Sequence, residues 1–421
     1  MSVRLQPPGA PDAISDRLHD VVVVGAGPAG GQLAANLARL GFAVVLVDQL
    51  TDLAQAAFSS AGVPISVLSR YGLPAQVVAS RCHGWQVLGP GDADRRWQAS
   101  SLQAVVLEFG QLRLWLADQC RLWGGTVLLG RRALGHTPLA DGRGVLTHLR
   151  NRGGAPETLR SRWLVDATGQ ARALLGDPPA AAGALVQGLG VEWLLRVSPE
   201  QWQRWQDRLS FCIGSDWIPN GYGWVFPMQA QQLKVGICRY HASGEQGQHR
   251  LGPALQALLQ RTGLSDGVVL DRHGGVVRST IRRREPHRRG PLLGLGDVVS
   301  TANLLGGEGI RHALCSAEVL TPLLASTLQR QRSGQSLEQA EQPLLKYSDH
   351  LKRALGWRWS LSGRIARRTW MGLESIQADQ RLEQLFRGLE KSRAEEISAL
   401  LFGYQFERYG WRALPYLFGW R

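Results

Sequence analysis

The sequence lacks the features that mark several classes of protein. None of its apolar runs reaches the roughly 18 residues that a membrane-spanning helix needs. The first twenty residues contain Pro7, Pro8, Pro11 and Asp12 instead of the continuous apolar stretch of a secretory signal peptide. The five cysteines are scattered and lack a CxxC pair. This pattern favours reduced thiols in a cytoplasmic protein over a disulfide framework or a zinc site.

Lysine is also scarce. Only four of the 48 basic residues are lysines, and the rest are arginines. The formal net charge of +14 suits binding to nucleic acid, to an anionic membrane or to a phosphorylated substrate. Zinc-finger spacings and RNA-binding signatures are missing from the sequence, so we expect no nucleic-acid partner. The histidines show no metal-ligand spacing, and neither a GxSxG motif nor a paired-carboxylate motif supports a hydrolase.

The first chemical motif follows a polar leader. A strand at 20–24 runs into a GxGxxG turn at 25–30 and a helix at 29–40. A second strand follows at 43–47 and ends at an acid, Asp48. These are, in order, the parts of a dinucleotide-binding unit. Gly25 permits the tight turn, Gly27 lets the backbone approach a pyrophosphate, and Gly30 lets helix and strand pack closely. Asp48 can accept hydrogen bonds from ribose hydroxyls and disfavours a 2′-phosphate. The unit therefore predicts FAD or NAD.

Two later segments bear on which dinucleotide is bound. An apolar run at 162–165 ends in Asp166-Ala-Thr-Gly169, a small-residue turn that alone is equally typical of a plain strand end. We expect a strand ending at Asp297, followed by a helix that begins near Glu308 within Gly307-Glu-Gly309-Ile. Asp297 could accept a bond from a ribitol hydroxyl. The helix N-terminus could face the isoalloxazine and stabilise negative charge on the reduced ring.

These three segments together resemble flavoproteins of the para-hydroxybenzoate hydroxylase type, in which a substrate domain is inserted into a discontinuous FAD domain. The sequence contains no second strand–GxGxxG–helix unit. FAD is therefore the expected cofactor, and NAD(P)H is expected to bind only transiently as the electron donor.

Alternating aromatic residues mark the expected substrate side. Tyr222, Trp224 and Phe226 lie in Pro-Asn-Gly-Tyr-Gly-Trp-Val-Phe-Pro and would project from one face of a strand. On spacing alone, a wall for an apolar ligand and ordinary aromatic packing are equally compatible with the pattern.

The same stretch resembles the PxxYxWxFP pattern of the geranylgeranyl reductase family, whose members saturate isoprenoid chains. The segment 303–310, Asn-Leu-Leu-Gly-Gly-Glu-Gly-Ile, is similar to that family's NPxTGEGI loop. The resemblance runs from about residue 20 to about 324. It implies a prenyl chain in a tunnel that reaches the flavin and is lined by Tyr222, Trp224 and Phe226.

The chain departs from the family pattern at three places. Phe58-Ser-Ser-Ala-Gly62 stands where a Cys-Gly-Gly element is common, and Leu304 replaces the proline of the later loop. An arginine is usual at the entry to the helix before the third strand of the FAD domain, where this chain has Glu108-Phe-Gly-Gln111.

The length of 421 residues and the 44% hydrophobic content suit a large multi-lobed protein. We expect an α/β fold with a Rossmann-like, discontinuous FAD-binding domain, an inserted, mostly antiparallel β-sheet substrate domain and a C-terminal helical region. We expect the FAD-binding domain to comprise residues 20–75, 103–184 and 286–335. The substrate domain is expected at 76–102 and 185–285, and the helical region at 336–421.

The helical region carries arginines interleaved with tryptophans, from Lys352 to Trp370. This composition suits a cap over the substrate domain, and it also suits peripheral contact with an anionic membrane surface. A further arginine cluster at 282–284 and 288–289 could be a solvated loop or could meet a diphosphate or NADPH.

Taken together, the sequence predicts an FAD-dependent oxidoreductase acting on an apolar, isoprenoid or other lipid substrate. Hydride would pass from NAD(P)H by way of the flavin N5 to a carbon–carbon double bond. Three alternatives stay open: a monooxygenase or halogenase of the same fold, a non-redox flavoprotein resembling lycopene cyclases, and a degenerate FAD-binding scaffold. The catalytic proton donor is not assigned, and no metal is expected.

Overall fold

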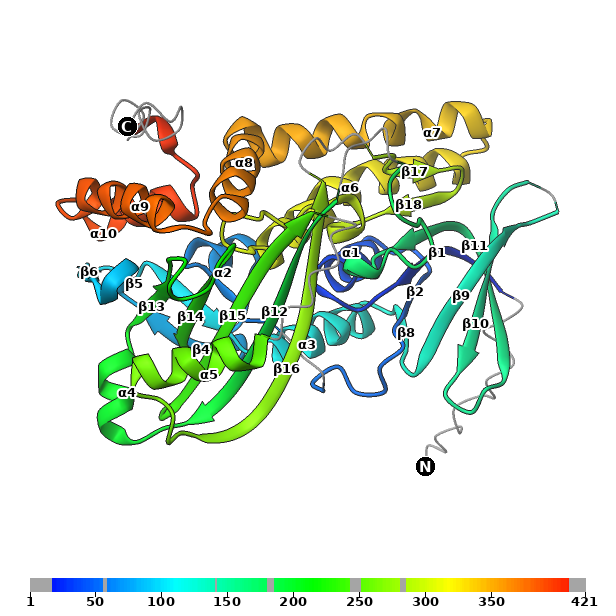
Figure 1. The fold of residues 1–421 in the computed structure, drawn as a ribbon. Coiled ribbons are helices and arrows are strands. Elements are labelled where there is room, and N and C mark those ends of the chain that lie inside the picture. Colours follow the sequence, from blue (N-terminus) through cyan, green and yellow to red (C-terminus); the bar gives the residue numbers. More distant parts are fainter. Residues whose placement is uncertain are drawn as a thin grey trace.

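The structure is a computed structural model that describes residues 17–55, 59–140, 142–179, 185–242, 251–280 and 285–408. Two lobes, each built on one large sheet, lie side by side, and the C-terminal helices run across both (Figure 1). All five cysteines lie within the described residues and are buried free thiols. Within these ranges no helix is both long and apolar enough to cross a bilayer.

The first lobe contains a sheet whose central strands are parallel. Among the described residues it has eight strands, in the order β17-β18-β11-β1-β2-β8, with β10 and β9 added beside β11. Their bounds are β1 Leu18–Val24, β2 Val44–Val47, β8 Thr126–Leu128, β9 Arg131–Pro138, β10 Val145–Asn151, β11 Pro156–Asp166, β17 Arg288–Arg289 and β18 Leu292–Gly294. β1 pairs in parallel with β2 and β11, and its valines are fully buried, as expected for a strand covered on both faces.

Three helices pack together against this sheet. They are α1 Pro28–Arg39, α3 Phe109–Leu122 and α6 Ile310–Arg332. α1 contacts both of the others, and an added Cβ on its Gly31 would lie only 2.8 Å from the Cβ of Leu116 on α3. The absence of a side chain at Gly31 therefore lets α3 approach α1 closely.

The second lobe contains a seven-stranded sheet in the order β16-β12-β15-β14-β13-β5-β6. Its strands are β5 Gly84–Leu88, β6 Asp94–Gln98, β12 Leu185–Arg196, β13 Arg208–Cys212, β14 Gly221–Pro227, β15 Gln232–Ala242 and β16 Val268–Thr280. Every pairing is antiparallel except that of β13 with β5. α4 Pro199–Trp205 and α5 Leu251–Thr262 share a core with one face of this sheet, and the other face looks toward the first lobe and the C-terminal helices.

A small sheet connects the two lobes. It has the order β3-β7-β4, with bounds Gly62–Pro64, Ala104–Leu107 and Val78–Cys82, and α2 Ser66–Tyr71 follows β3. Short 3-10 turns are η2 Ala75–Val77, η3 Pro90–Asp92, η4 Gly169–Ala171, η6 Gly296–Val299 and η7 Phe406–Arg408. Val105 and Leu107 pack with α3 and the start of α6, whereas Val106 belongs to the core beneath the seven-stranded sheet.

The C-terminal helices are α7 Leu337–Leu345, α8 Tyr347–Met371, α9 Ile376–Leu389 and α10 Ala394–Leu401. α8 is bent at Gly356, whose φ of +81° is non-helical. The first part of α8 contributes Tyr347 and Leu351 to the core of the first lobe, and the second part contributes Ala366 and Trp370 to the core of the second. This bend allows one helix to cover both lobes.

The fold class predicted from the sequence is confirmed: a Rossmann-like parallel sheet, a mostly antiparallel second sheet and a helical C-terminal region. Two element ends differ from expectation. The strand expected to end at Asp297 ends at Gly294, because Gly296 takes a φ of +64° and the chain turns into η6. The helix expected near Glu308 begins at Ile310, because Glu308 forms backbone hydrogen bonds with Asn303.

Candidate active site

The glycine-rich turn between β1 and α1 is shaped for a ligand. An added Cβ on Gly25 would lie 2.3 Å from the carbonyl oxygen of Ala167, and one on Gly30 would lie 2.0 Å from that of Gly25. Around Gly27, in contrast, no described atom lies within 4 Å of an added Cβ. Since α1 has neither a side-chain cap nor an acidic residue in its first turn, its amides are available to an anion at the open side of the turn.

Asp48 stands beside this turn at the end of β2. Its Oδ2 accepts a hydrogen bond from the Ala26 amide at 2.7 Å, and its Oδ1 accepts one from the Leu50 amide at 2.9 Å. These bonds fix the carboxylate next to the turn and leave lone pairs free for ligand hydroxyls.

Arg113 is a functional candidate that the sequence reasoning missed. It lies on α3, is only 6% exposed, and reaches the carbonyl oxygen of Ala26 at 3.5 Å from its Nε. One Nη lies 3.9 Å from the Asp48 carboxylate. Burial lowers the pKa of Arg113, and the nearby Asp48 charge opposes that shift. A usable signal was present, because Arg113, Leu116, Ala117 and Cys120 form one buried helical stripe in which an arginine is unusual.

The third motif meets the first at the start of α6. An added Cβ on Gly296 would lie 2.8 Å from the Cβ of Ala29, so η6 abuts the first turn of α1. The Asp297 carboxylate accepts a hydrogen bond from the Thr301 hydroxyl at 2.9 Å and lies 3.5 Å from the position of a Cβ on Gly309. Asp297 therefore stands between the N-termini of α1 and α6, and α6 also lacks a side-chain cap and a first-turn acid.

The turn at 166–169 shapes the wall of this site. Asp166 is fully buried, and its carboxylate accepts hydrogen bonds from the Thr168 hydroxyl at 2.6 Å and from the Leu175 amide at 2.8 Å. These bonds hold Ala167 against Gly25. Residues 166–169 therefore help to form the glycine-rich turn.

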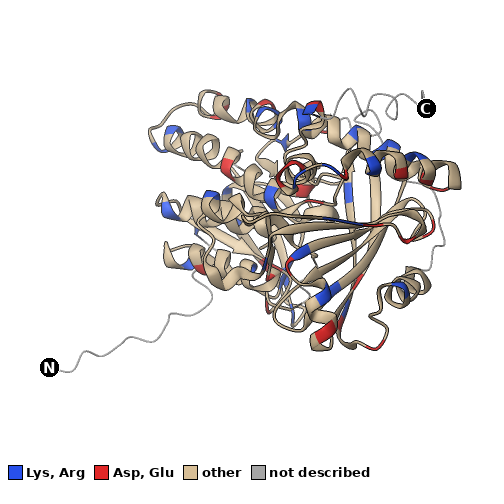
Figure 2. Cartoon of the chain, turned by 90° about the vertical axis from the view of Figure 1, so that its left-hand side faces the viewer, with Lys and Arg blue, Asp and Glu red and all other residues tan. Residues whose placement is uncertain are grey.

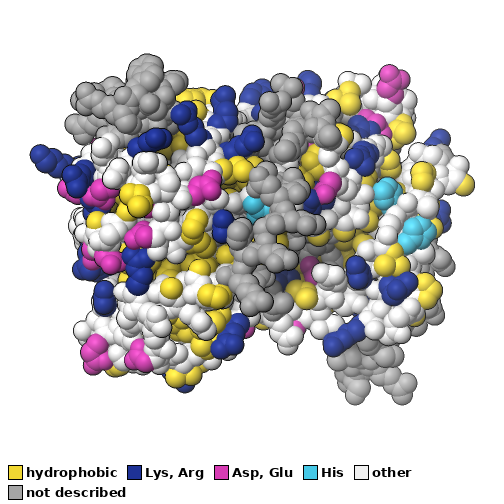
Figure 3. All heavy atoms as spheres, in the orientation of Figure 1, with side chains coloured by type: hydrophobic (Ala, Val, Ile, Leu, Met, Phe, Trp, Pro, Cys, Tyr) yellow, Lys and Arg dark blue, Asp and Glu magenta, His cyan; other side chains and the backbone are white. Residues whose placement is uncertain are grey.

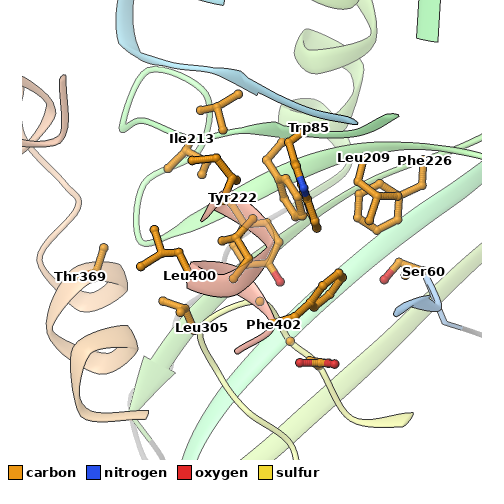
Figure 4. A pocket seen from close by; sticks show the side chains of 18 of the residues that line it. Ser60, Trp85, Leu209, Ile213, Tyr222, Phe226, Leu305, Thr369, Leu400 and Phe402 are labelled. Atoms are coloured by element: carbon orange, nitrogen blue, oxygen red, sulfur yellow. The ribbon is translucent and has the colours of Figure 1, made fainter. Parts of the chain in front are cut away.

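An apolar cavity of about 310 Å³ lies next to the N-terminus of α6. Its walls are residues 59–63, residues 305–310, the inner face of the seven-stranded sheet, and α8, α9 and α10 with residues 402–406. In Figure 4, Phe226 and Leu209 lie on the side of Ser60, Trp85 and Tyr222 lie in the middle, and Thr369, Leu305 and Leu400 lie on the far side. The cavity is therefore continuous from the start of α6 to the C-terminal helices.

The three aromatic residues of β14 have different positions relative to this cavity. Tyr222 and Phe226 line it, whereas Trp224 does not. The Trp224 ring lies over Gly236, where an added Cβ would come within 2.3 Å of it, and its Nε1 donates a hydrogen bond to Glu192 at 2.7 Å. Trp224 thus leans along the sheet toward β15 and β12.

Tyr222 brings a hydroxyl to the start of α6. Its oxygen lies 2.9 Å from the position of a Cβ on Gly307, whose φ is +62°. Burial, followed by the neighbouring Cys238 and Tyr240, raises the pKa of Tyr222 well above its ordinary value. The hydroxyl is therefore protonated at neutral pH.

Glu308 fastens the C-terminal segment to the loop before α6. Its carboxylate accepts two hydrogen bonds from Arg311, both at 2.6 Å, and one from the Tyr404 hydroxyl at 2.7 Å. Burial alone would raise the pKa of Glu308, but the charges of Arg311 and His312 outweigh it and the pKa lies below its ordinary value. Arg311 also donates to the carbonyl of Phe402 at 2.8 Å, so the ionised carboxylate helps close one side of the cavity.

Indole N–H groups fix other walls of the cavity. Trp85 donates to the Ser398 hydroxyl at 2.8 Å, and Trp97 donates to the Leu389 carbonyl at 3.0 Å. Trp370 donates to the Leu304 carbonyl at 3.0 Å, so Leu304, which stands where the family has proline, holds α8 through its backbone. These bonds tie the helical region to the sheet and to the loop before α6.

The segment that lacks the family's cysteine also lies at this site. Ser59 to Gly62 line the cavity, and the Ser59 carbonyl accepts a hydrogen bond from the Lys234 ammonium at 2.6 Å, whereas Phe58 lies outside the described residues. The arginines at 282–284 also lie outside them, and Arg288 is paired with Glu341. Within the described ranges, no group of three or more His, Cys, Asp or Glu side chains could hold a metal ion.

An acid beside a glycine-rich turn, two helix N-termini without side-chain caps and an apolar cavity beside one of them are typical of a flavoprotein oxidoreductase. Residues 19–351 match the family model described as FAD binding domain, and the chain therefore belongs to this family. It is an FAD-dependent oxidoreductase, and it is similar to proteins named as geranylgeranyl reductases, as the sequence resemblance predicted.

Two curated relatives and one solved structure illustrate the likeness. The chain is 26% identical over 399 residues to the digeranylgeranylglycerophospholipid reductase of Haloferax volcanii, covering 90% of this chain and 92% of the relative. It is 22% identical to the chloroplastic geranylgeranyl diphosphate reductase of Arabidopsis thaliana, covering 76% and 68%. A geranylgeranyl bacteriochlorophyll reductase-like structure from Thermoplasma acidophilum superposes with a TM-score of 0.75 at 20% identity, covering 93% and 98%.

Proposed function

We propose that this oxidoreductase reduces carbon–carbon double bonds in an isoprenoid chain, with FAD as the resident cofactor and NAD(P)H as the transient electron donor. The observation that carries the proposal is the apolar cavity that begins at residues 306–310, beside the N-terminus of α6. The names of the two relatives, which refer to geranylgeranyl compounds, support the same class of substrate.

The cofactor would be held by the converging glycines and acids. Gly25, Gly27 and Gly30 would cradle the pyrophosphate at the N-terminus of α1. In addition, Asp48 would bind the adenosine ribose, Asp297 the ribitol, and Gly307 and Gly309 the ring edge. The fit rests on the open side of Gly27 and on the uncapped start of α6. When bound, FAD supplies the hydride chemistry, and this chain supplies the orientation and the electrostatics.

The substrate side of the site would exclude water and position the alkene. Phe226 and Tyr222 would contact the prenyl chain directly, and Trp224 would support them from behind. The Tyr222 hydroxyl is a protonated group at the cavity wall beside Gly307, which makes it a candidate to hold the proton that alkene reduction requires.

We also propose that the outer face of α8 contacts an anionic membrane surface from which such a substrate would be drawn. Trp357 is 62% exposed and recurs at helical spacing with the exposed Arg364 and Arg368. Figure 2 shows basic residues along the C-terminal helices, and Figure 3 shows several along the upper edge of the molecule, where Figure 1 places α8. Co-sedimentation with vesicles of anionic and of neutral lipid tests this contact.

The central test is anaerobic reoxidation of the dithionite-reduced protein by a geranylgeranyl lipid, followed at the absorption band of oxidised flavin. Return of the band with the lipid supports alkene reduction. Phytanol, which has the same branched skeleton without double bonds, serves as the control and should leave the flavin reduced. Return of the band only after oxygen is admitted would overturn the proposal for this lipid and favour a monooxygenase or another flavoprotein of this fold.

A further inference from the structure

One row of side chains crosses the seven-stranded sheet along the floor of the cavity. Phe226 on β14 and Leu209 on β13 both lie against Gly62, where an added Cβ would be 3.0 Å and 3.3 Å from them. Leu209 is the strand partner of Trp85 on β5, and Trp85 is the partner of Trp97 on β6. Paired residues point to the same face of a sheet, and all four side chains line the cavity.

This row defines the direction in which the cavity extends away from the start of α6. It starts at Gly62, whose neighbours Ala61 and Val63 share a core with Ile310 at the start of α6, and it ends on β6, the edge strand of the sheet. Four adjacent strands are separated by three interstrand spacings, so the row is roughly 14 Å long. A chain that enters beside the cofactor site would therefore lie across the strands and point toward Trp97.

Trp97 forms the wall at the end of this row. It is 5% exposed, and its Nε1 is held by the Leu389 carbonyl at 3.0 Å. Trp97 also lines a surface depression whose other residues are mainly polar, among them Arg96, Glu390 and Arg393. The residue therefore stands between the apolar cavity and a polar surface.

We propose that Trp97 is a specificity-determining residue that sets the longest prenyl chain the cavity accepts. The inference rests on the proposed function, since it takes an isoprenoid as the occupant. A longer chain would have to displace a hydrogen-bonded indole or emerge among charged side chains, and both are unfavourable for an apolar group. Leu209 lies earlier in the same row, so a larger side chain there would end the cavity sooner.

The test is the equilibrium binding of geraniol, farnesol, geranylgeraniol and solanesol to the FAD-loaded protein at a fixed detergent concentration. For wild type, affinity should rise with chain length and then fall once the chain exceeds the row. Trp97→Leu should move the optimum to a longer prenol and improve binding of the longest one by about tenfold. Leu209→Phe should move the optimum to a shorter prenol, and this opposite shift is an independent check.

Two controls separate length selection from other effects. Trp97→Phe retains most of the wall but loses the hydrogen bond to Leu389, and it should keep a profile near wild type. Trp123→Ala removes a tryptophan that is 48% exposed at the end of α3, and it should change nothing. Equal profiles for wild type, Trp97→Leu and Leu209→Phe would overturn the role of Trp97 alone. Failure of every prenol to bind wild type would overturn the proposed function together with it.

Discussion

The two halves of the candidate site are built in opposite ways. The dinucleotide turn and its acid lie in one continuous stretch, from β1 through α1 to Asp48 at the end of β2, and Ala167 packs on Gly25 from a distant segment. The substrate cavity is assembled from strands β5, β6, β13 and β14, a loop before α6 and three C-terminal helices. The first depends mainly on local backbone geometry, whereas the second depends on the packing of segments that are hundreds of residues apart.

This difference between the turn and the cavity predicts where substitutions are tolerated. At the turn, the positions of Gly25 and Gly30 are fixed by backbone atoms only 2.3 Å and 2.0 Å from an added Cβ. In the cavity, the walls are side chains held by single hydrogen bonds, such as that of Trp370 to Leu304. We therefore expect cofactor binding to fail abruptly on substitution and substrate selection to change by degrees.

The largest effect is expected at the open glycine of the turn. Gly27→Glu should abolish FAD binding, a loss of at least about a thousandfold, because a carboxylate would occupy the position of the pyrophosphate. Since an added Cβ at Gly27 meets no described atom, the protein should remain folded. Flavin fluorescence titration measures the binding, and circular dichroism verifies the fold.

Gly30→Ala is the matched control for this substitution. Its Cβ would collide with the backbone of Gly25, so this variant should lose thermal stability even before FAD is added. If Gly27→Glu retained its flavin, the nucleotide site would not be at this turn, and the contrast between the two halves would disappear.

The next effect concerns the carboxylate of Glu308, which holds the C-terminal segment against the loop before α6. Glu308→Gln should lower the free energy of unfolding by roughly 3 kcal/mol at neutral pH, because a buried ion pair with Arg311 loses one partner. The folded-state pKa of Glu308 is depressed, so its contribution is present above the unfolded pKa of about 4.3 and is lost as the pH falls through the folded value.

Urea unfolding of wild type and Glu308→Gln at a series of pH values measures this difference. The two proteins should differ most near neutrality and converge as the solution becomes acidic. A gap that stayed constant across the acid range would show that the Glu308 charge does not fasten Tyr404 and Phe402 to the loop.

The aromatic residues of β14 test the cavity itself. Phe226→Ala should weaken prenol binding by roughly tenfold or more, because a side chain in direct contact with the chain is removed. Trp224→Phe should leave prenol binding within about twofold, yet lower the free energy of unfolding by about 1–3 kcal/mol, because buried Glu192 loses its donor. Equal losses of affinity in both variants would place Trp224 in the wall.

The sequence predicted more of the structure of the turn than of the cavity, and the reason is physical. The period of the apolar residues and the spacing of Gly25, Gly27 and Gly30 determine β1, α1 and β2 within a single stretch. The alternation at 222–226 correctly predicted a strand, but it could not show that Trp224 leans over Gly236, because that contact needs the register of β14 against β15. The row from Phe226 to Trp97 likewise appears only once four strands are paired.

Arg113, like Ala167, is a non-local part of the dinucleotide site, which is otherwise built from one stretch of sequence. Its approach to Ala26 and Asp48 depends on how α3 packs against Gly31 of α1, which no single stretch of sequence specifies. Arg113→Met should weaken FAD binding by about tenfold, the loss of one charge-assisted contact to an anionic ligand. The measurement is isothermal titration with FAD, with Arg121→Met at the exposed end of α3 as the control.

Competition by ADP and by adenosine distinguishes the part of the ligand that Arg113 meets. A contact with phosphate predicts that Arg113→Met weakens ADP binding while adenosine binding stays unchanged. Equal loss for both would mean that Arg113 acts by positioning Asp48, the residue expected at the ribose. Unchanged FAD affinity would show that Arg113 does not contribute to the cofactor site, and the contrast between the two halves would then be greater.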